Sequence, residues 1–308
     1  MRIISGKYLS RAAVGFISTA ILAWPAASTE KGASIPALSG HWGRTLFNLE
    51  DPPSGQGPLN NTMRRANGTI DDNAGRVADF NSPLLKPEAA QILKKRGEYS
   101  LTGESIPDNH NQCWPEPPPF TLTIQLEMQL LQRKDEVVLL YVNDHKVRHV
   151  RLNVPHPEHV TPSWQGDSVG HYEGDTLVVD TVGIKTGPFS SVDRYGTPFS
   201  ERMHVVERYR LIDGEAAAAA VRKHARTFNA NAAPVRFDGY GAEVDLDTHK
   251  KGLQVEVTVD DPGSFTMPWS GLVTYQPETT WPEMVCAENL RESSGPERVV
   301  PVADKPDF

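Results

Sequence analysis

The segment 168–181 constrains the fold more than any other part of the chain, because two stretches of alternating residues flank the dipeptide Gly174-Asp175. Glycine and aspartate are typical of the two-residue turns that join antiparallel strands. A turn here pairs Glu173 with Thr176 and Val169 with Asp180. Side chains alternate across a strand, so the hairpin has a largely polar face and an apolar face that must meet a core. The polar face holds Val169, His171, Glu173, Thr176, Val178 and Asp180, and the core face holds Gly170, Tyr172, Leu177, Val179 and Thr181.

The same alternation recurs between residues 116 and 290, where turn residues separate short apolar-polar stretches. Hydrophobic residues make up 38% of the 308 residues, which is enough to build a core. The candidate strands are 128–133, 137–143, 146–152, 168–173, 176–182, 204–212, 253–260 and 271–276. The pattern predicts a mainly β domain, an antiparallel lipocalin-like barrel of about eight strands, which is a size able to enclose one small ligand.

The regions outside these strands have a different character. Residues 29–115 are rich in Gly, Pro, Asn and Asp, which predicts an irregular arm with one short helix over 87–96, begun by Pro87 and stopped by Gly97. Residues 213–251 interrupt the strand pattern, and their run of alanines predicts a helix over 215–226. This helical insertion is either a lid or a surface excursion. We expect 291–308 to be a flexible tail.

The N-terminal residues 1–28 have the layout of a secretory signal peptide. Arg2, Lys7 and Arg11 precede the mostly apolar segment 12–24, and small residues follow it. The alternative is a buried N-terminal helix. We therefore expect a periplasmic or secreted protein without a membrane span, since no stretch reaches the roughly 18 to 20 apolar residues that a span needs. The net charge of −8 argues against a nucleic-acid partner.

The chain has two cysteines, Cys113 and Cys286. In an oxidising compartment an even number of cysteines favours a disulfide, which would join the start of the strand region to its end. The alternative is a reactive thiol. There is no Cys-x-x-Cys spacing, so a structural zinc site is not expected.

His171 and Asp180 are the predicted catalytic pair, because they are diagonal neighbours on the polar face of the hairpin. A carboxylate beside an imidazole holds its tautomer and raises its pKa, which tunes a general base. The alternative is the solvated polar face of an ordinary sheet.

Glu207 provides a second clue, because it shares a strand face with Val205, Tyr209 and Leu211. A carboxylate on an apolar face needs a partner. Arg148 is the candidate partner, since its own face is otherwise apolar. The two residues would form either a buried ion pair or an anchor for a ligand.

Other side chains are weaker candidates for ligand binding: Asp144, His145, His204, Trp164 and Trp269. The tryptophans would line a pocket mouth or seal the ends of the barrel. His145 and His149 are four residues apart, which on a strand separates them by roughly 13 Å, too far for one metal ion. We expect neither a metal nor a cofactor, and no nucleotide-binding or serine-esterase motif is present.

The run WQGDSVGHYEGDTLVVDT at 164–181, with weaker motifs at 38–42, 144–148, 156–157 and 204–208, resembles a family of exported bacterial proteins. The resemblance implies export and carries no activity to this chain. The family pattern passes from the segment at 204–208 almost directly to the one at 260–262, so 213–251 is an insertion by this comparison.

These observations lead to one functional prediction and two alternatives. The chain is predicted to be an exported β-barrel that binds a small, partly apolar molecule in a central cavity. The first alternative is a cofactor-independent acid–base enzyme, a lyase, isomerase or hydrolase, in which His171 and Asp180 act while Arg148 and Glu207 hold the substrate. The second is a structural protein of the cell envelope. The sequence does not indicate an oligomeric state.

Overall fold

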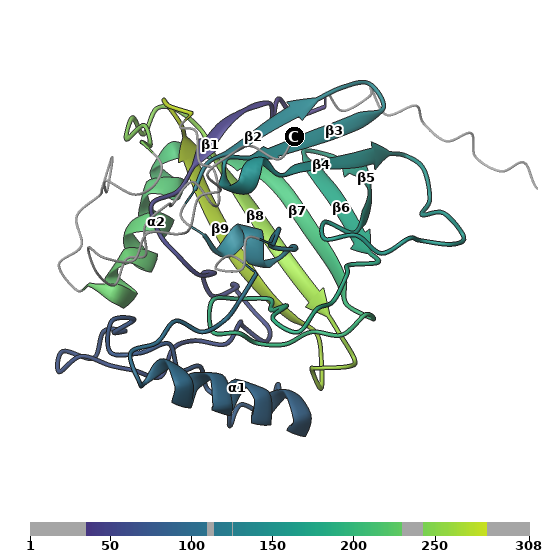
Figure 1. The fold of residues 1–308 in the computed structure, drawn as a ribbon. Coiled ribbons are helices and arrows are strands. Elements are labelled where there is room, and N and C mark those ends of the chain that lie inside the picture. Colours follow the sequence, from purple (N-terminus) through teal and green to yellow (C-terminus); the bar gives the residue numbers. More distant parts are fainter. Residues whose placement is uncertain (1–34, 110–113, 125, 230–242, 282–308) are drawn as a thin grey trace, which may run out of the picture. The chain divides into compact units, whose positions relative to one another are not determined.

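The computed structural model describes residues 35–109, 114–124, 126–229 and 243–281. In these residues nine strands close into one barrel, with each strand beside its neighbours in sequence and β1 against β9 (Figure 1). The strands are β1 (Gly40–Gly43), β2 (Met128–Gln132), β3 (Glu136–Tyr141), β4 (Val147–Leu152), β5 (Asp167–Glu173), β6 (Thr176–Val182), β7 (His204–Ile212), β8 (Gly252–Asp260) and β9 (Trp269–Pro277). The prediction of a mainly β barrel is confirmed.

Two features of the barrel differ from the prediction. The additional strand is β1, which has only four residues with a glycine at each end, so no alternation marks it in the sequence. It closes the barrel by pairing with both β2 and β9. The second difference is that β4 and β5 run parallel, so the barrel is not wholly antiparallel. The long connection over 153–166 makes this possible, because a tight hairpin can join only antiparallel strands.

The hairpin of β5 and β6 has the predicted register. Glu173 pairs with Thr176, His171 with Val178, and Val169 with Asp180. Leu177 and Val179 of the predicted core face are fully buried and Tyr172 is partly buried, whereas His171 is exposed. The predicted core face therefore points into the barrel.

Apolar side chains occupy the inside of the barrel. The fully buried set includes Leu130, Val137, Leu139, Val150, Leu177, Val179, Val205, Val255, Val257 and Val273. Trp269 is buried and packs edge-on against Phe265, with ring centroids 5.8 Å apart. Of the two predicted roles for this tryptophan, its burial in the core cluster favours sealing the barrel over lining a pocket mouth.

The arm contains the helix α1 (Pro87–Ser100), which begins at Pro87 as predicted. Gly97 does not stop it, and the helix continues for three residues. Gly97 is buried, and a Cβ atom there would lie 3.1 Å from a methyl carbon of Val77. The glycine thus allows close packing of the arm. Two short 3-10 helices also lie outside the insertion within the described residues: η2 (Phe120–Thr123) and η3 (Asn143–His145).

The insertion forms the second helix, α2 (Gly214–Phe228), which confirms the predicted helix and extends it slightly. It packs beside β8 and β9 on the outside of the barrel (Figure 1). Small residues allow the close approach, since a Cβ atom on Gly252 would lie 2.4 Å from the Cβ of Ala217. Within the described ranges, no helix combines the length and the apolar character that a membrane crossing requires.

Candidate functional site

Inside the barrel, β4 and β7 hold one buried ion pair. The guanidinium of Arg148 donates to both carboxylate oxygens of Glu207, and the contact from NH1 to Oε1 measures 3.0 Å. Their side chains are 2% and 0% exposed. The predicted partnership between the two residues is confirmed.

Neighbouring hydroxyl groups form further hydrogen bonds with the guanidinium and the carboxylate of this ion pair. Arg148 Nε donates to Ser168 Oγ at 2.9 Å, and its NH2 donates to Thr181 Oγ1 at 2.6 Å. Tyr209 donates its hydroxyl to Glu207 at 3.0 Å, and burial together with that carboxylate raises the pKa of the Tyr209 phenol. A buried guanidinium with all of these partners in place stabilises the barrel, so the geometry favours the ion pair over a ligand anchor.

The predicted pairing of His171 with Asp180 is wrong. Both side chains lie on the outer face, but His171 Nε2 is 3.0 Å from Glu173 Oε1, which is two residues away on the same strand face. Asp180 bonds to two other histidines. The predicted enzyme centre is also divided, because Arg148 and Glu207 lie inside the barrel wall while His171 and Asp180 lie outside it.

Asp180 is instead the centre of a cluster on the outer surface. Its Oδ1 lies 3.0 Å from His156 Nε2 and 2.9 Å from His204 Nε2. The other nitrogen of His156, Nδ1, lies 2.6 Å from Asp167 Oδ1. Arg151 NH2 donates to both oxygens of Asp167, at 2.7 and 2.9 Å. We call these five residues the outer His–Asp cluster.

The outer His–Asp cluster is partly exposed, and the bond between His204 and Asp180 shifts the pKa of both groups. The bond to Asp180 raises the pKa of His204, and the bond from His204 lowers the pKa of Asp180. Their side chains are 40% and 39% exposed. In the part of the chain that is described, no three His, Cys, Asp or Glu side chains are grouped so as to hold a metal ion. Because His204 and Asp180 are partly exposed, they can exchange protons with solvent.

The remaining predicted site residues are scattered. Trp164 stacks on Trp114 with centroids 5.4 Å apart, and Lys185 Nζ lies 4.9 Å from its ring. His145 is exposed in η3, and the side chain of Asp144 lies outside the description. The predicted signal peptide, both cysteines of the predicted disulfide (Cys113 and Cys286) and the predicted tail also lie outside the described residues.

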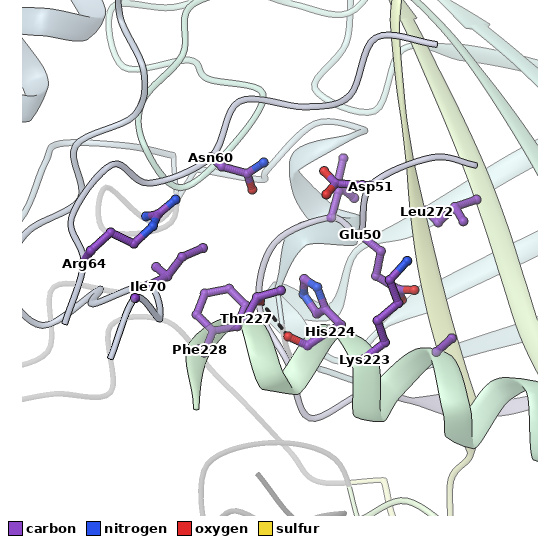
Figure 2. A pocket seen from close by; sticks show the side chains of 13 residues that line it. Glu50, Asp51, Asn60, Arg64, Ile70, Lys223, His224, Thr227, Phe228 and Leu272 are labelled. Atoms are coloured by element: carbon purple, nitrogen blue, oxygen red, sulfur yellow. Dashed lines mark hydrogen bonds between the residues drawn. The ribbon is translucent and has the colours of Figure 1, made fainter. Parts of the chain in front are cut away.

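A cavity of about 430 Å³ lies between α2 and the N-terminal arm, outside the barrel (Figure 2). One face of α2 forms one wall, and the arm with part of β9 forms the other (Figure 2). The helix contributes Ala220, Lys223, His224, Thr227 and Phe228. These positions follow helical spacing, which places them on one face. The opposite side includes Leu49, Glu50, Asn60, Arg64, Ile70 and Leu272.

Hydrogen bonds fix the two walls of this cavity. The backbone N–H of Ile70 donates to the carbonyl of Thr227 at 2.8 Å. Arg65 NH1 donates to the carbonyl of Phe228 at 2.6 Å, which places a cation at the C-terminus of α2 where the helix dipole favours it. Glu50 Oε1 accepts from the backbone N–H of Thr274 at 2.9 Å. The cavity is thus largely preformed.

His224 is a buried polar group in the helical wall. Its Nε2 donates to the carbonyl of Phe47 at 2.8 Å, since a carbonyl can only accept. Burial, followed by the nearby charge of Arg44, lowers the pKa of His224. Burial and Arg44 thus favour the neutral ring, in which Nδ1 is an acceptor.

The cavity and part of the cluster were not predicted from the sequence. The helical spacing of 220, 223, 224, 227 and 228 was a usable signal for one wall. The opposite wall comes from the irregular arm, whose path no periodicity indicates. Asp167 and Arg151 join the cluster only because the loop over 153–166 brings His156 back to the wall.

Comparisons with known proteins add no identification. No family model matches the chain, and no match was found among curated proteins or solved structures.

Proposed function

We propose that this chain is an exported binding protein that holds a small, partly apolar molecule between α2 and the N-terminal arm. The observation that carries the proposal is the cavity of about 430 Å³ between these two elements. Its volume lies in the range of roughly 300 to 1,000 Å³ that is usual for small-molecule sites. Buried apolar side chains occupy the inside of the barrel, so the proposal places the ligand in this outer cavity.

The side chains that line the cavity suit a molecule with an apolar body and a polar end. Leu49, Ile70, Phe228 and Leu272 provide apolar contact surface. The neutral ring of His224 provides an acceptor for a hydroxyl or amine donor on the ligand.

In this proposal the lipocalin-like feature is the barrel, while the binding site lies on its outer side. The barrel acts as a rigid frame, and the insertion that includes α2 provides a wall of the site. Of the two interpretations of the insertion, lid and surface excursion, the proposal develops the first. The proposal also includes export directed by residues 1–28. The partner is a small molecule and not a nucleic acid.

Blocking the cavity tests the proposal. Ala220 lines it and Ala219 is exposed on the same helix, so Ala220→Trp fills the site while Ala219→Trp is the matched control. The probe is anilinonaphthalene sulfonate, a fluorescent molecule with an apolar body and one charged end. We expect one equivalent to bind wild type and Ala219→Trp alike, and Ala220→Trp to bind at least about tenfold more weakly. Equal binding by all three proteins would refute the proposal.

A further inference from the structure

The seam between β4 and β5 is a weak place in the barrel wall. These strands form the parallel pair, and only three register pairs join them: Val150 with Ser168, Arg151 with Val169, and Leu152 with Gly170. A concavity of about 330 Å³ lies where the pairing stops. Val147 and His149 line it from β4, and Ser163, Gln165 and Gly166 line it from the connecting loop.

The middle of that loop is held to the barrel by the hydrogen bonds of one side chain and by the packing of Val160 against Gly183. At the loop ends, the backbone N–H of Asn153 donates to Gly170 at 2.8 Å and that of Ser163 donates to Gly183 at 3.1 Å. Between them, among the hydrogen bonds of the described residues, only those of His156 connect 154–162 to the strands. His156 therefore provides the hydrogen bonds that hold 154–162 on the wall, where Val160 also packs against Gly183.

The bonds of His156 require a specific proton count. Nδ1 faces an oxygen of Asp167 at 2.6 Å, and Nε2 faces an oxygen of Asp180 at 3.0 Å. An ionised carboxylate only accepts, so both ring nitrogens must carry a proton for both bonds to form. If the ring loses one proton, a nitrogen lone pair faces a carboxylate oxygen and that bond becomes repulsive.

We propose that His156 is a proton-operated latch that holds residues 154–162, the middle of the connection between β4 and β5, on the outer wall in acid and releases them as the pH rises. The latch is independent of the binding site at α2. Charged groups face it from each neighbouring strand. They are Arg151 on β4, Asp167 on β5, Asp180 on β6 and His204 on β7, with Asp260 on β8 acting on His204 and with Glu158 and His159 on the loop itself.

His204 couples to the latch because it bonds to the same oxygen of Asp180 as His156 does. A proton on His204 adds a positive charge beside that oxygen and weakens its hold on His156. The bond between His156 and Asp180 therefore depends on the state of His204 as well.

Cleavage by a glutamate-specific protease reports the state of the loop, because Glu158 is exposed within it. The rate at Glu158 is divided by the rate for a free peptide of residues 153–163 at the same pH, which removes the pH dependence of the protease. Between about pH 5.5 and about pH 8, we expect this ratio to rise at least tenfold in wild type. His156→Gln should be cleaved rapidly at both values, and His171→Gln, an exposed histidine outside the cluster, should behave as wild type.

A flat wild-type ratio, or a pH dependence that persists in His156→Gln, would overturn the proposal. If His156→Gln does not fold, nitrogen-15 NMR of the wild-type imidazole decides the matter. Two protonated nitrogens on His156 in acid support the latch, and one unprotonated nitrogen overturns it. Protection by one equivalent of Zn²⁺ at the higher pH would also overturn it, because His156 would then be a metal ligand.

Discussion

The two polar groups on either side of the β4–β7 wall use the same chemistry in opposite ways. Inside, Arg148 and Glu207 are 2% and 0% exposed, and hydroxyl groups complete their bonding. Outside, His204 and Asp180 are 40% and 39% exposed, and their bonding depends on the proton count. Burial makes the first group a fixed structural element, whereas partial exposure makes the second a group that responds to pH.

Strand β6 shows the contrast within two adjacent residues. Thr181 points inward and accepts from Arg148, while Asp180 points outward and binds two histidines. The alternation of a β-strand is thus enough to place one residue in the structural network and its neighbour in the titrating one.

Removing half of the inner pair should have the largest effect. Glu207→Leu leaves the buried Arg148 guanidinium without its counter-charge, so we expect the free energy of unfolding to fall by about 3 to 5 kcal/mol. Urea denaturation measures the change. The double variant Arg148→Met with Glu207→Leu should lose clearly less, because no buried charge is left unpaired. A loss below about 1 kcal/mol in Glu207→Leu would show that the inner pair is not structural.

A smaller effect is expected when one hydroxyl of the inner network is removed. Thr181→Val deletes an acceptor of the buried guanidinium while it keeps the shape of the side chain. We expect a loss of about 1.5 to 3 kcal/mol in urea denaturation. Thr176→Val on the same strand is the control, because the hydroxyl of Thr176 donates to the exposed Asp175 and its loss should change stability by less than about 0.5 kcal/mol. Equal losses in the two variants would remove the distinction between the faces.

The smallest effect is the pH-dependent stability contributed by the outer pair. The raised pKa of His204 gives stability that is present in acid and is lost as the pH rises through that pKa. The lowered pKa of Asp180 gives stability that is lost as the pH falls through it. Wild type should therefore exceed His204→Gln most in the mildly acidic window between the two, by no more than about 1 kcal/mol because the pair is partly exposed.

Urea denaturation of both proteins across this pH range measures the difference. A difference that does not vary with pH, or one that grows on the alkaline side, would contradict the assignment of His204 as the titrating partner of Asp180.

The local patterns predicted the barrel well because they depend on near neighbours. Alternation and turn chemistry specified the register of β5 and β6, and an unmatched carboxylate on an apolar face was enough to pair Glu207 with Arg148. Strand β1 carried no such pattern.

The outer site could not be predicted in the same way. Alternation says which face a side chain occupies, but it does not say which neighbour on that face it bonds. His171 bonds to Glu173, and Asp180 bonds to the loop residue His156. The cavity at α2 depends on the path of the irregular arm, which has no period to follow.

The most direct test of where the protein binds its ligand is hydrogen exchange with and without saturating anilinonaphthalene sulfonate. Binding outside the wall predicts slower exchange in residues 49–70 and in α2, with β2, β3 and β4 unchanged. Slower exchange in those three strands, with residues 49–70 and α2 unaffected, would show that the ligand enters the barrel and would contradict the account.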